Sequence, residues 1–124
     1  MRFVIFLIVV ATSCFSCCSK HCIVDKQFIN NFNKELQVIK SLEEKRNDTT
    51  SPEEYVRVLA YLSHITGYLP RADYSSTLGY RNKRYYSEDM KKIHEWLKNN
   101  KCGFTKAKAD SILLATRNPT IISN

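Results

Sequence analysis

One stretch of the sequence decides the fold: Ser51-Pro52-Glu53-Glu54-Tyr55-Val56-Arg57-Val58-Leu59-Ala60-Tyr61-Leu62-Ser63-His64-Ile65-Thr66-Gly67. Serine at the N-cap, proline directly after it and glutamate three residues later form a capping box, which marks the start of a helix. The apolar residues then recur at gaps of three and four, which places them on one helical face: Tyr55, Val58, Leu59, Leu62 and Ile65. Gly67 ends the helix, because glycine adopts the left-handed backbone conformation at little cost. We therefore expect an amphipathic helix that packs against other helices.

A second helix is predicted upstream, over residues 25–46. Its apolar residues follow the same period and draw one stripe along the helix: Phe28, Ile29, Phe32, Leu36, Ile39 and Leu42. Asp25 is the expected N-cap, and the basic pair at residues 45–46 suits the negative pole of the helix dipole. The polar residues 47–50 break the pattern and separate this helix from the next one.

Two further helices are predicted downstream. Ser87 is the expected N-cap of the first, and its apolar face is formed by Met90, Ile93, Trp96 and Leu97. We expect Trp96 to be largely buried on that face. Residues 99–103 end this helix, and Thr105 is the expected cap of a last helix whose apolar residues are Ala109, Ile112 and Leu113. Its pattern is lost before Pro119.

These elements define an all-α domain, a small bundle of about four helices at residues 25–118, followed by a tail at residues 119–124. A length of 124 residues suits one domain, and 44% hydrophobic residues with only three glycines and three prolines argue against disorder. Residues 68–86 between the second and third helices show no sustained period. They are expected to form a long tyrosine-rich loop, which contains five of the seven tyrosines of the chain.

The tyrosine-rich loop is the expected binding surface, because tyrosine and arginine are the residues that anchor interfaces. Loops of this length in compact domains are often functional. The predicted partner-binding residues are Tyr80, Arg81, Lys83, Arg84, Tyr85 and Tyr86. In the alternative interpretation the tyrosines pack into grooves between helices and leave their hydroxyl groups in water.

The N-terminus has the build of a signal peptide. Arg2 is followed by nine apolar residues, Phe3 to Ala11, a run too short to span a bilayer, which needs about 20. We therefore expect residues 1–13 to direct export, with residues 14–24 as a tether to the helical domain.

The segment Ala11-Thr12-Ser13-Cys14 resembles the lipobox of bacterial lipoproteins, although Ala11 stands where leucine is commonest. The resemblance implies that the Cys14 thiol receives a diacylglycerol, that the signal is cut just before it, and that the new amine is acylated. Several acyl chains would then hold the protein in a membrane of the cell envelope, facing the periplasm or the cell surface. The mature chain would retain Cys17, Cys18, Cys22 and Cys102.

Ordinary secretion is the alternative, with a cut before Lys20. Cys22 and Cys102 would then be the remaining cysteines, an even pair able to form one disulfide in an oxidising compartment. The same N-terminal region contains a C-x-x-C step and His21, but no second pair of ligands follows at zinc-finger spacing. We expect no metal and no other cofactor.

A second resemblance covers residues 55–115. Tyr61-Leu62-Ser63-His64-Ile65-Thr66-Gly67, the later Tyr80, and Trp96-Leu97-Lys98-Asn99-Asn100-Lys101-Cys102 resemble small uncharacterised lipoproteins of Bacteroidetes bacteria. These pair a helix that ends in ITG with one that ends in W-x-x-x-N-K. The resemblance implies a lipoprotein location, and it implies no particular activity.

The sequence does not predict an enzyme. His21, His64 and His94 stand far apart, and no zinc-protease, nucleophile-elbow or phosphate-loop pattern is present. The acidic pairs at 43–44, 53–54 and 88–89 are interpreted as solvated faces or first-turn acids of helices.

The net charge of +7, or +6 without Arg2, favours an anionic partner such as lipid, glycan or an acidic protein. The basic residues form no nucleic-acid module, so nucleic acid is not an expected partner. The leading prediction is a lipid-anchored envelope protein that binds another macromolecule, as an immunity or inhibitor-like protein or an accessory subunit. A secreted eukaryotic effector with one disulfide is the alternative, and a small enzyme comes third.

Overall fold

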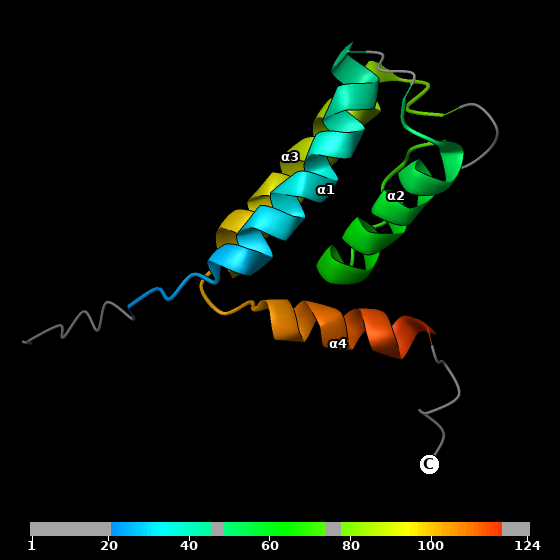
Figure 1. Ribbon diagram of the computed structural model, residues 1–124. Coiled ribbons are helices and arrows are strands. Elements are labelled where there is room, and N and C mark those ends of the chain that lie inside the picture. The colour runs from blue at the N-terminus through cyan, green and yellow to red at the C-terminus, as the bar shows by residue number, and fades with distance from the viewer. Residues whose placement is uncertain (1–20, 46–48, 74–77, 118–124) are drawn as a thin grey trace, which may run out of the picture.

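The computed structural model describes residues 21–45, 49–73 and 78–117 (Figure 1). The expected signal at residues 1–13, the lipidation residue Cys14 and the tail at 119–124 lie outside the described residues. The chain forms α1 (Lys26–Lys45), α2 (Pro52–Thr66), α3 (Lys83–Asn100) and α4 (Lys106–Arg117). The all-α fold class predicted from the sequence is therefore confirmed.

The predicted caps of α1, α2 and α4 are present. Asp25 Oδ1 accepts hydrogen bonds from the backbone N–H of the second and third residues after it, at 2.9 and 3.2 Å. Ser51 Oγ accepts from the Glu54 N–H at 3.1 Å, and Thr105 Oγ1 accepts from the Lys108 N–H at 3.2 Å. Gly67 ends α2 in the left-handed conformation, with φ of 69°. Each cap satisfies backbone groups that a helix end leaves without partners.

The expectation that Ser87 caps α3 is wrong. The helix begins five residues earlier, with Asn82 at the N-cap, where its Oδ1 accepts from the Arg84 N–H at 2.8 Å. Tyr86 is the first inward-facing residue of α3, one turn before Met90 and two turns before Ile93. The tyrosine-rich loop is consequently shorter than predicted, and Lys83 to Tyr86 belong to the helix.

The core lies where the four helices meet. In Figure 1, α1 and α3 run side by side in opposite directions, α2 lies beside them, and α4 crosses their lower ends. Most residues of the predicted stripes are buried, together with residues of the loop and of the α3–α4 turn: Phe28, Phe32, Leu36, Ile39, Tyr55, Val58, Leu59, Leu62, Ile65, Ala72, Met90, Ile93, Phe104 and Ala109.

Trp96 is partly buried and packs against the core. Its ring stacks on Phe32 with centroids 5.7 Å apart and meets Phe104 edge-on at 5.1 Å. Phe104 also contacts Phe28 at 4.8 Å. This aromatic cluster joins α1, α3 and the turn before α4.

A disulfide joins Cys22 to Cys102 across 80 residues of sequence. Cys22 precedes α1 and Cys102 follows α3, so the bond ties the start of α1 to the end of α3. Residue 22, which the sequence placed in the tether, is thus covalently fixed to the helical domain.

Candidate functional site

A buried carboxylate fastens the tyrosine-rich loop to α3. Asp89 has no exposed surface, and it accepts hydrogen bonds from the Tyr68 hydroxyl at 2.6 Å and the Tyr80 hydroxyl at 3.1 Å. The Arg71 backbone N–H donates at 2.6 Å, and the Arg71 guanidinium adds two bonds at 2.6 and 2.9 Å. Burial disfavours the charged form, but these donors outweigh it and leave the pKa of Asp89 below its ordinary value.

A second carboxylate holds the same loop from α1. Glu43 Oε1 accepts from the Tyr80 N–H at 2.7 Å and from the Tyr55 hydroxyl at 3.3 Å. The approach requires glycine at position 79, because a Cβ there would lie 2.6 Å from Glu43 Oε1 and φ is +105°. Tyr80 is therefore fixed at its backbone by Glu43 and at its hydroxyl by Asp89. The expectation that both acids lie on solvated helix faces is wrong for Asp89, which is buried, and for Glu43, which bonds the loop.

The structure divides the predicted binding tyrosines into two kinds. Tyr80 and Tyr86 are partly buried and meet edge-to-face at 5.4 Å, and the Tyr86 hydroxyl donates to Glu44 at 3.0 Å. Burial and the Glu44 carboxylate raise the pKa of Tyr86. Tyr85 is 44% exposed, with the Arg71 guanidinium 4.4 Å above its ring. Of the three, only Tyr85 presents its ring to solvent.

The predicted cations remain at the surface around Tyr85. We call the exposed set the loop-end surface, and it consists of Arg71, Arg81, Lys83, Arg84 and Tyr85. Arg81 pairs with Asp73 at 2.6 Å and Arg84 pairs with Glu88 at 2.8 Å. Both arginine side chains are about four-fifths exposed, at 78% and 81%, so these pairs are weak and a carboxylate of a partner would compete for the same guanidinium groups. The arrangement suits an acidic partner with apolar side chains for Tyr85.

Arg71 is the residue of this surface that sequence reasoning missed. It follows a buried proline in a segment with no periodic pattern, so nothing in the sequence connects it to α3. Its guanidinium reaches Asp89 and Glu88, the latter at 2.9 Å, and these carboxylates raise the pKa of Arg71. Arg71 therefore links the buried network to the exposed surface.

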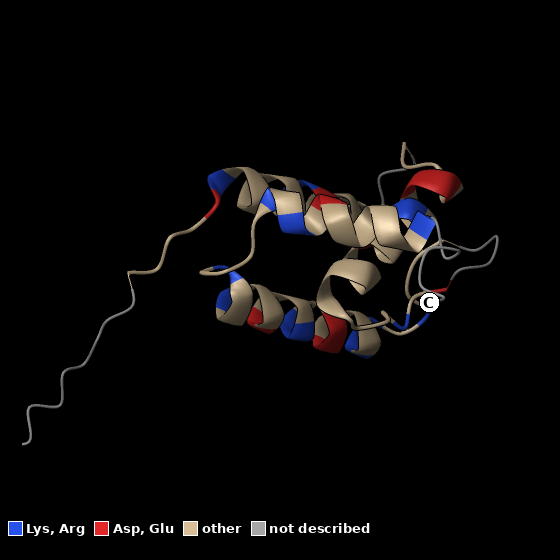
Figure 2. Cartoon of the chain, turned by 90° about the horizontal axis from the view of Figure 1, so that it is seen from below, with Lys and Arg blue, Asp and Glu red and all other residues tan. Residues whose placement is uncertain are grey.

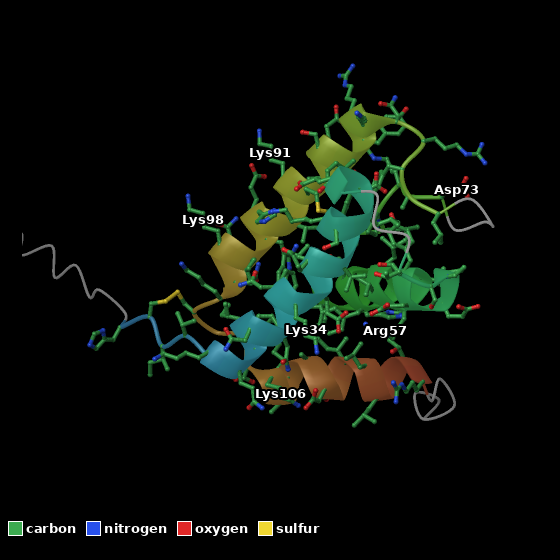
Figure 3. The ribbon with its side chains drawn as sticks, turned by 45° about the horizontal axis from the view of Figure 1, so that its top comes forward. Lys34, Arg57, Asp73, Lys91, Lys98 and Lys106 are labelled. Carbon is green, nitrogen blue, oxygen red and sulfur yellow. A yellow bond between two sulfur atoms is a disulfide. The ribbon has the colours of Figure 1, made fainter. Side chains whose placement is uncertain are left out.

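The charges of α3 are arranged by position along the helix. Figure 2 shows Lys and Arg residues at both of its ends, with acidic residues and further lysines between them. One end carries Lys83 and Arg84 beside the loop, and the other carries Lys98, followed by Lys101 and the disulfide. In Figure 3, Asp73 marks the loop, and Lys98 lies toward the yellow disulfide. The loop-end surface and the disulfide thus occupy opposite ends of the molecule.

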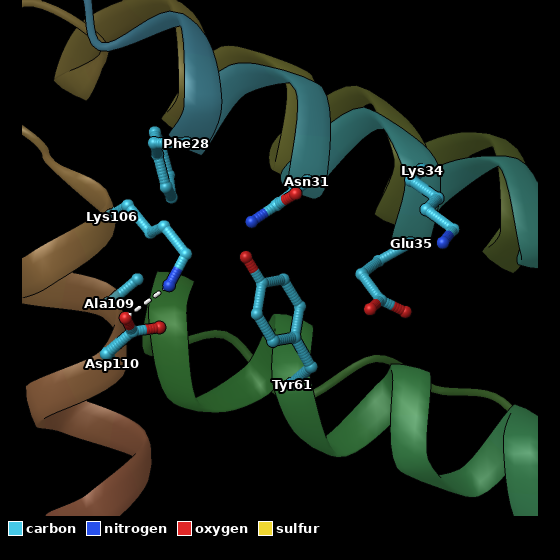
Figure 4. A pocket seen from close by; sticks show the side chains of 8 residues that line it. All are labelled: Phe28, Asn31, Lys34, Glu35, Tyr61, Lys106, Ala109 and Asp110. Carbon is cyan, nitrogen blue, oxygen red and sulfur yellow. Dashed lines mark hydrogen bonds and ion pairs between the residues drawn. The ribbon is translucent and has the colours of Figure 1, made fainter.

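A small cavity of about 230 Å³ lies between α1, α2 and α4 (Figure 4). Its lining is mostly polar and comprises Phe28, Asn31, Lys34, Glu35, Tyr61, Lys106, Ala109 and Asp110. Burial, with the nearby carboxylates of Glu35 and Asp110, raises the pKa of Tyr61 to about 12. Tyr61 is therefore a neutral phenol near pH 7. The cavity is smaller than the roughly 300–1,000 Å³ usual for ligand pockets.

Among residues 21–45, 49–73 and 78–117, no group of three or more His, Cys, Asp or Glu side chains could hold a metal ion. Within the same ranges no helix is both long and apolar enough to cross a membrane. His94 is exposed on α3, and its Nδ1 lies 2.7 Å from the Met90 carbonyl oxygen.

Comparison with protein families, curated proteins and solved structures finds no match to this chain. Its class is therefore defined by the fold and the site alone: a small disulfide-linked helical domain with a cationic and aromatic surface at one end.

Proposed function

We propose that this chain is an exported envelope protein, lipid-anchored at Cys14, that binds an acidic macromolecule through its loop-end surface. The observation that carries the proposal is the separation of the two ends of α3. At about 1.5 Å per residue, its 18 residues span roughly 27 Å between the loop-end surface and the disulfide. A chain anchored through its N-terminus would present the loop-end surface away from the membrane.

The disulfide supports the proposed export. Disulfides persist in oxidising compartments and are rare in the cytosol, where thiols are kept reduced. Cys22 and Cys102 are both exposed, so the bond would be open to cytosolic reductants. We further propose that the chain is a Bacteroidetes-type lipoprotein, which rests on the lipobox-like residues 11–14 and the resemblance over residues 55–115.

The binding role is supported by how the loop is built. Two carboxylates and their hydrogen bonds hold the backbone of the loop at Arg71 and Tyr80, so that backbone needs little ordering when a partner arrives. An immunity or inhibitor-like protein, or an accessory subunit of an envelope complex, would use such a preformed surface. The disulfide equally favours the second candidate, a secreted effector without a lipid.

Intact mass of the native protein separates these two candidates. Lipidation predicts a mature chain that begins at Cys14 and carries acyl groups, and Cys14→Ser should stop acyl incorporation and leave the uncut precursor. An unmodified chain that begins at Lys20 would reject the lipid anchor and leave the secreted form.

The binding role is tested with two variants that remove equal charge from opposite ends. The loop-end variant replaces Arg81, Lys83 and Arg84 with Gln, and the control replaces Lys26, Lys98 and Lys101 with Gln. A partner is first captured from native envelope and identified, and association rates are then measured over a range of salt concentrations. The loop-end variant should associate about tenfold more slowly and show a flatter salt dependence, because the steering charges are gone.

The control variant should associate at the wild-type rate, since it keeps the loop-end surface. Urea unfolding of all three proteins shows whether the substitutions leave the fold intact. A loop-end variant that binds at the wild-type rate at every salt concentration would reject this surface as the binding site.

A further inference from the structure

The disulfide end of the molecule carries apolar side chains that the fold leaves uncovered. Ile23 is 81% exposed, and Val24 lies beside it at the edge of a groove of about 350 Å³. The groove is lined by Val24, Ile29, His94, Leu97, Lys98 and Lys101. Three of these lining residues are aliphatic and two are lysines.

A third cation stands at the same end. Lys26 is the first residue of α1, and the disulfide holds the start of α1 next to the end of α3, where Lys98 and Lys101 lie. Asp25 is the acidic neighbour, and its two oxygens accept three backbone N–H bonds, from residues 27, 28 and 106. These bonds engage both oxygens of Asp25 and lower its pKa. Lys26, Lys98 and Lys101 are all exposed. We call Ile23, Val24, Lys26, Lys98 and Lys101 the disulfide-end surface.

The length of the N-terminal chain limits where this surface can lie. His21 lies seven positions after Cys14, and a fully extended chain over seven residue steps reaches at most roughly 25 Å. Given the proposed lipid anchor at Cys14, on which this step rests, the disulfide end stays within that distance of the lipid headgroups. A membrane surface is therefore the partner that this end meets at the highest local concentration.

We propose that the disulfide-end surface docks on an anionic phospholipid surface. Ile23 and Val24 enter the boundary between headgroups and acyl chains, where an apolar side chain leaves water. Lys26, Lys98 and Lys101 lie at the headgroup level and attract anionic lipids, while their aliphatic stems cover the apolar pair. The domain then stands on the membrane with α3 directed away from it, and the loop-end surface faces outward.

The test uses residues 20–124, which contain all four helices, the core and the disulfide, and which lack both the signal and Cys14. Binding is measured by sedimentation with vesicles of phosphatidylcholine alone and with vesicles containing one-third phosphatidylglycerol, at low and high salt. The wild-type chain should sediment with the anionic vesicles and should not sediment with the neutral ones. Each lysine near the surface contributes roughly a fivefold change in partition.

The same two charge-matched variants are used here, with the Lys26, Lys98 and Lys101 variant as the test and the loop-end variant as the control. Replacing Lys26, Lys98 and Lys101 with Gln should lower binding to anionic vesicles by more than about tenfold, whereas the loop-end variant should change it by less than about twofold. Equal losses in both variants would show an effect of net charge and overturn the proposal. The absence of binding by the wild-type chain at low salt would also overturn it.

Ile23→Ser with Val24→Ser tests insertion without a change in charge. The double variant should bind anionic vesicles several-fold more weakly, and unchanged binding would overturn the insertion step. Polyglutamate serves as a soluble acidic probe. If it competes as well as vesicles do and the Ile23 and Val24 substitutions have no effect, the surface belongs to an acidic protein partner instead. Because this chain lacks Cys14, a failure here leaves the mass and partner-capture results of the proposed function intact.

Discussion

At the scale of single residues, the fold depends on one charge placed in its interior. The Asp89 side chain is completely removed from water, which is costly unless hydrogen-bond donors of the protein replace the water. Two tyrosine hydroxyls, one backbone N–H and the guanidinium of Arg71 replace it. Arg71 remains 37% exposed, so one partner of the ion pair keeps part of its hydration. The network therefore fixes the loop without burying both charges.

Asp89→Asn should destabilise the protein by about 2–3 kcal/mol at pH 7, because hydrogen bonds to a charged group become neutral ones. The pKa of Asp89 is lowered in the folded state, so its contribution is present above the unfolded-state pKa of about 4 and is lost as pH falls through the folded-state pKa. The difference between wild type and variant should therefore shrink below pH 4. Urea unfolding at pH 7 and pH 3 measures it.

Asp110→Asn is the matched control for that experiment. Asp110 is an exposed acid that forms an ion pair with Lys106 one turn away on α4. Its substitution should change the free energy of unfolding by less than about 0.5–1 kcal/mol. A difference between wild type and Asp89→Asn that stays constant from pH 7 to pH 3 would show that the charge of Asp89 does not supply the stability.

The sequence was enough to predict which residue types form the candidate site, but not what each residue contacts there. Tyrosine and arginine content predicted a binding segment here, and Tyr85, Arg81, Lys83 and Arg84 lie at the surface. The sequence could not separate Tyr85 from Tyr80, because the difference depends on Asp89 and Glu43, which approach from other helices. Contacts between residues far apart in the chain leave no local pattern.

At the scale of helices, the ends were predicted well where a cap and an apolar period agree. Ser51 and Gly67 flank a clear stripe in α2, and the bounds follow the sequence closely. In α3 two candidate caps compete. Ser87 precedes two acids, which is a common helix start, whereas Asn82 precedes two basic residues that oppose the dipole. The earlier start prevails because it turns Tyr86 toward α1 and places Asp89 among its donors.

The described parts of the tyrosine-rich loop, residues 68–73 and 78–82, likewise make more contacts than their sequence indicates. Asp73 and Gly79 form an antiparallel bridge, with the Asp73 N–H donating to the Gly79 carbonyl at 2.9 Å. Pro70 and Ala72 are buried against the helices. An irregular segment that is hydrogen-bonded at both sides loses little entropy on binding, which is the property a recognition surface requires.

At the scale of the whole molecule, the two cationic ends of α3 are separated by a single rigid element. The loop-end surface is exposed and aromatic, and the disulfide-end surface is exposed and aliphatic. Aromatic and arginine side chains suit protein interfaces, whereas isoleucine, valine and lysine suit the lipid boundary. The same net charge therefore supports two proposed contacts of different chemistry, which the charge-matched variants separate.

The disulfide is the one covalent constraint in the described part of the chain, and it encloses α1, α2 and α3 while α4 lies outside the closed loop. Replacing Cys22 and Cys102 with Ser should lower the free energy of unfolding by about 2–4 kcal/mol, because the open chain gains conformational entropy when it unfolds. Urea unfolding should also show a larger m value, since the unfolded chain without the link exposes more surface.

Reduced wild-type protein provides the control, because it lacks the link and keeps both cysteines. Its unfolding midpoint should coincide with that of the double variant, and oxidation should restore the higher one. If reduction left the midpoint unchanged, the link would contribute nothing to stability. The expected loss is a large fraction of the roughly 5–15 kcal/mol that holds a small domain together, which is consistent with the proposed export to an oxidising compartment.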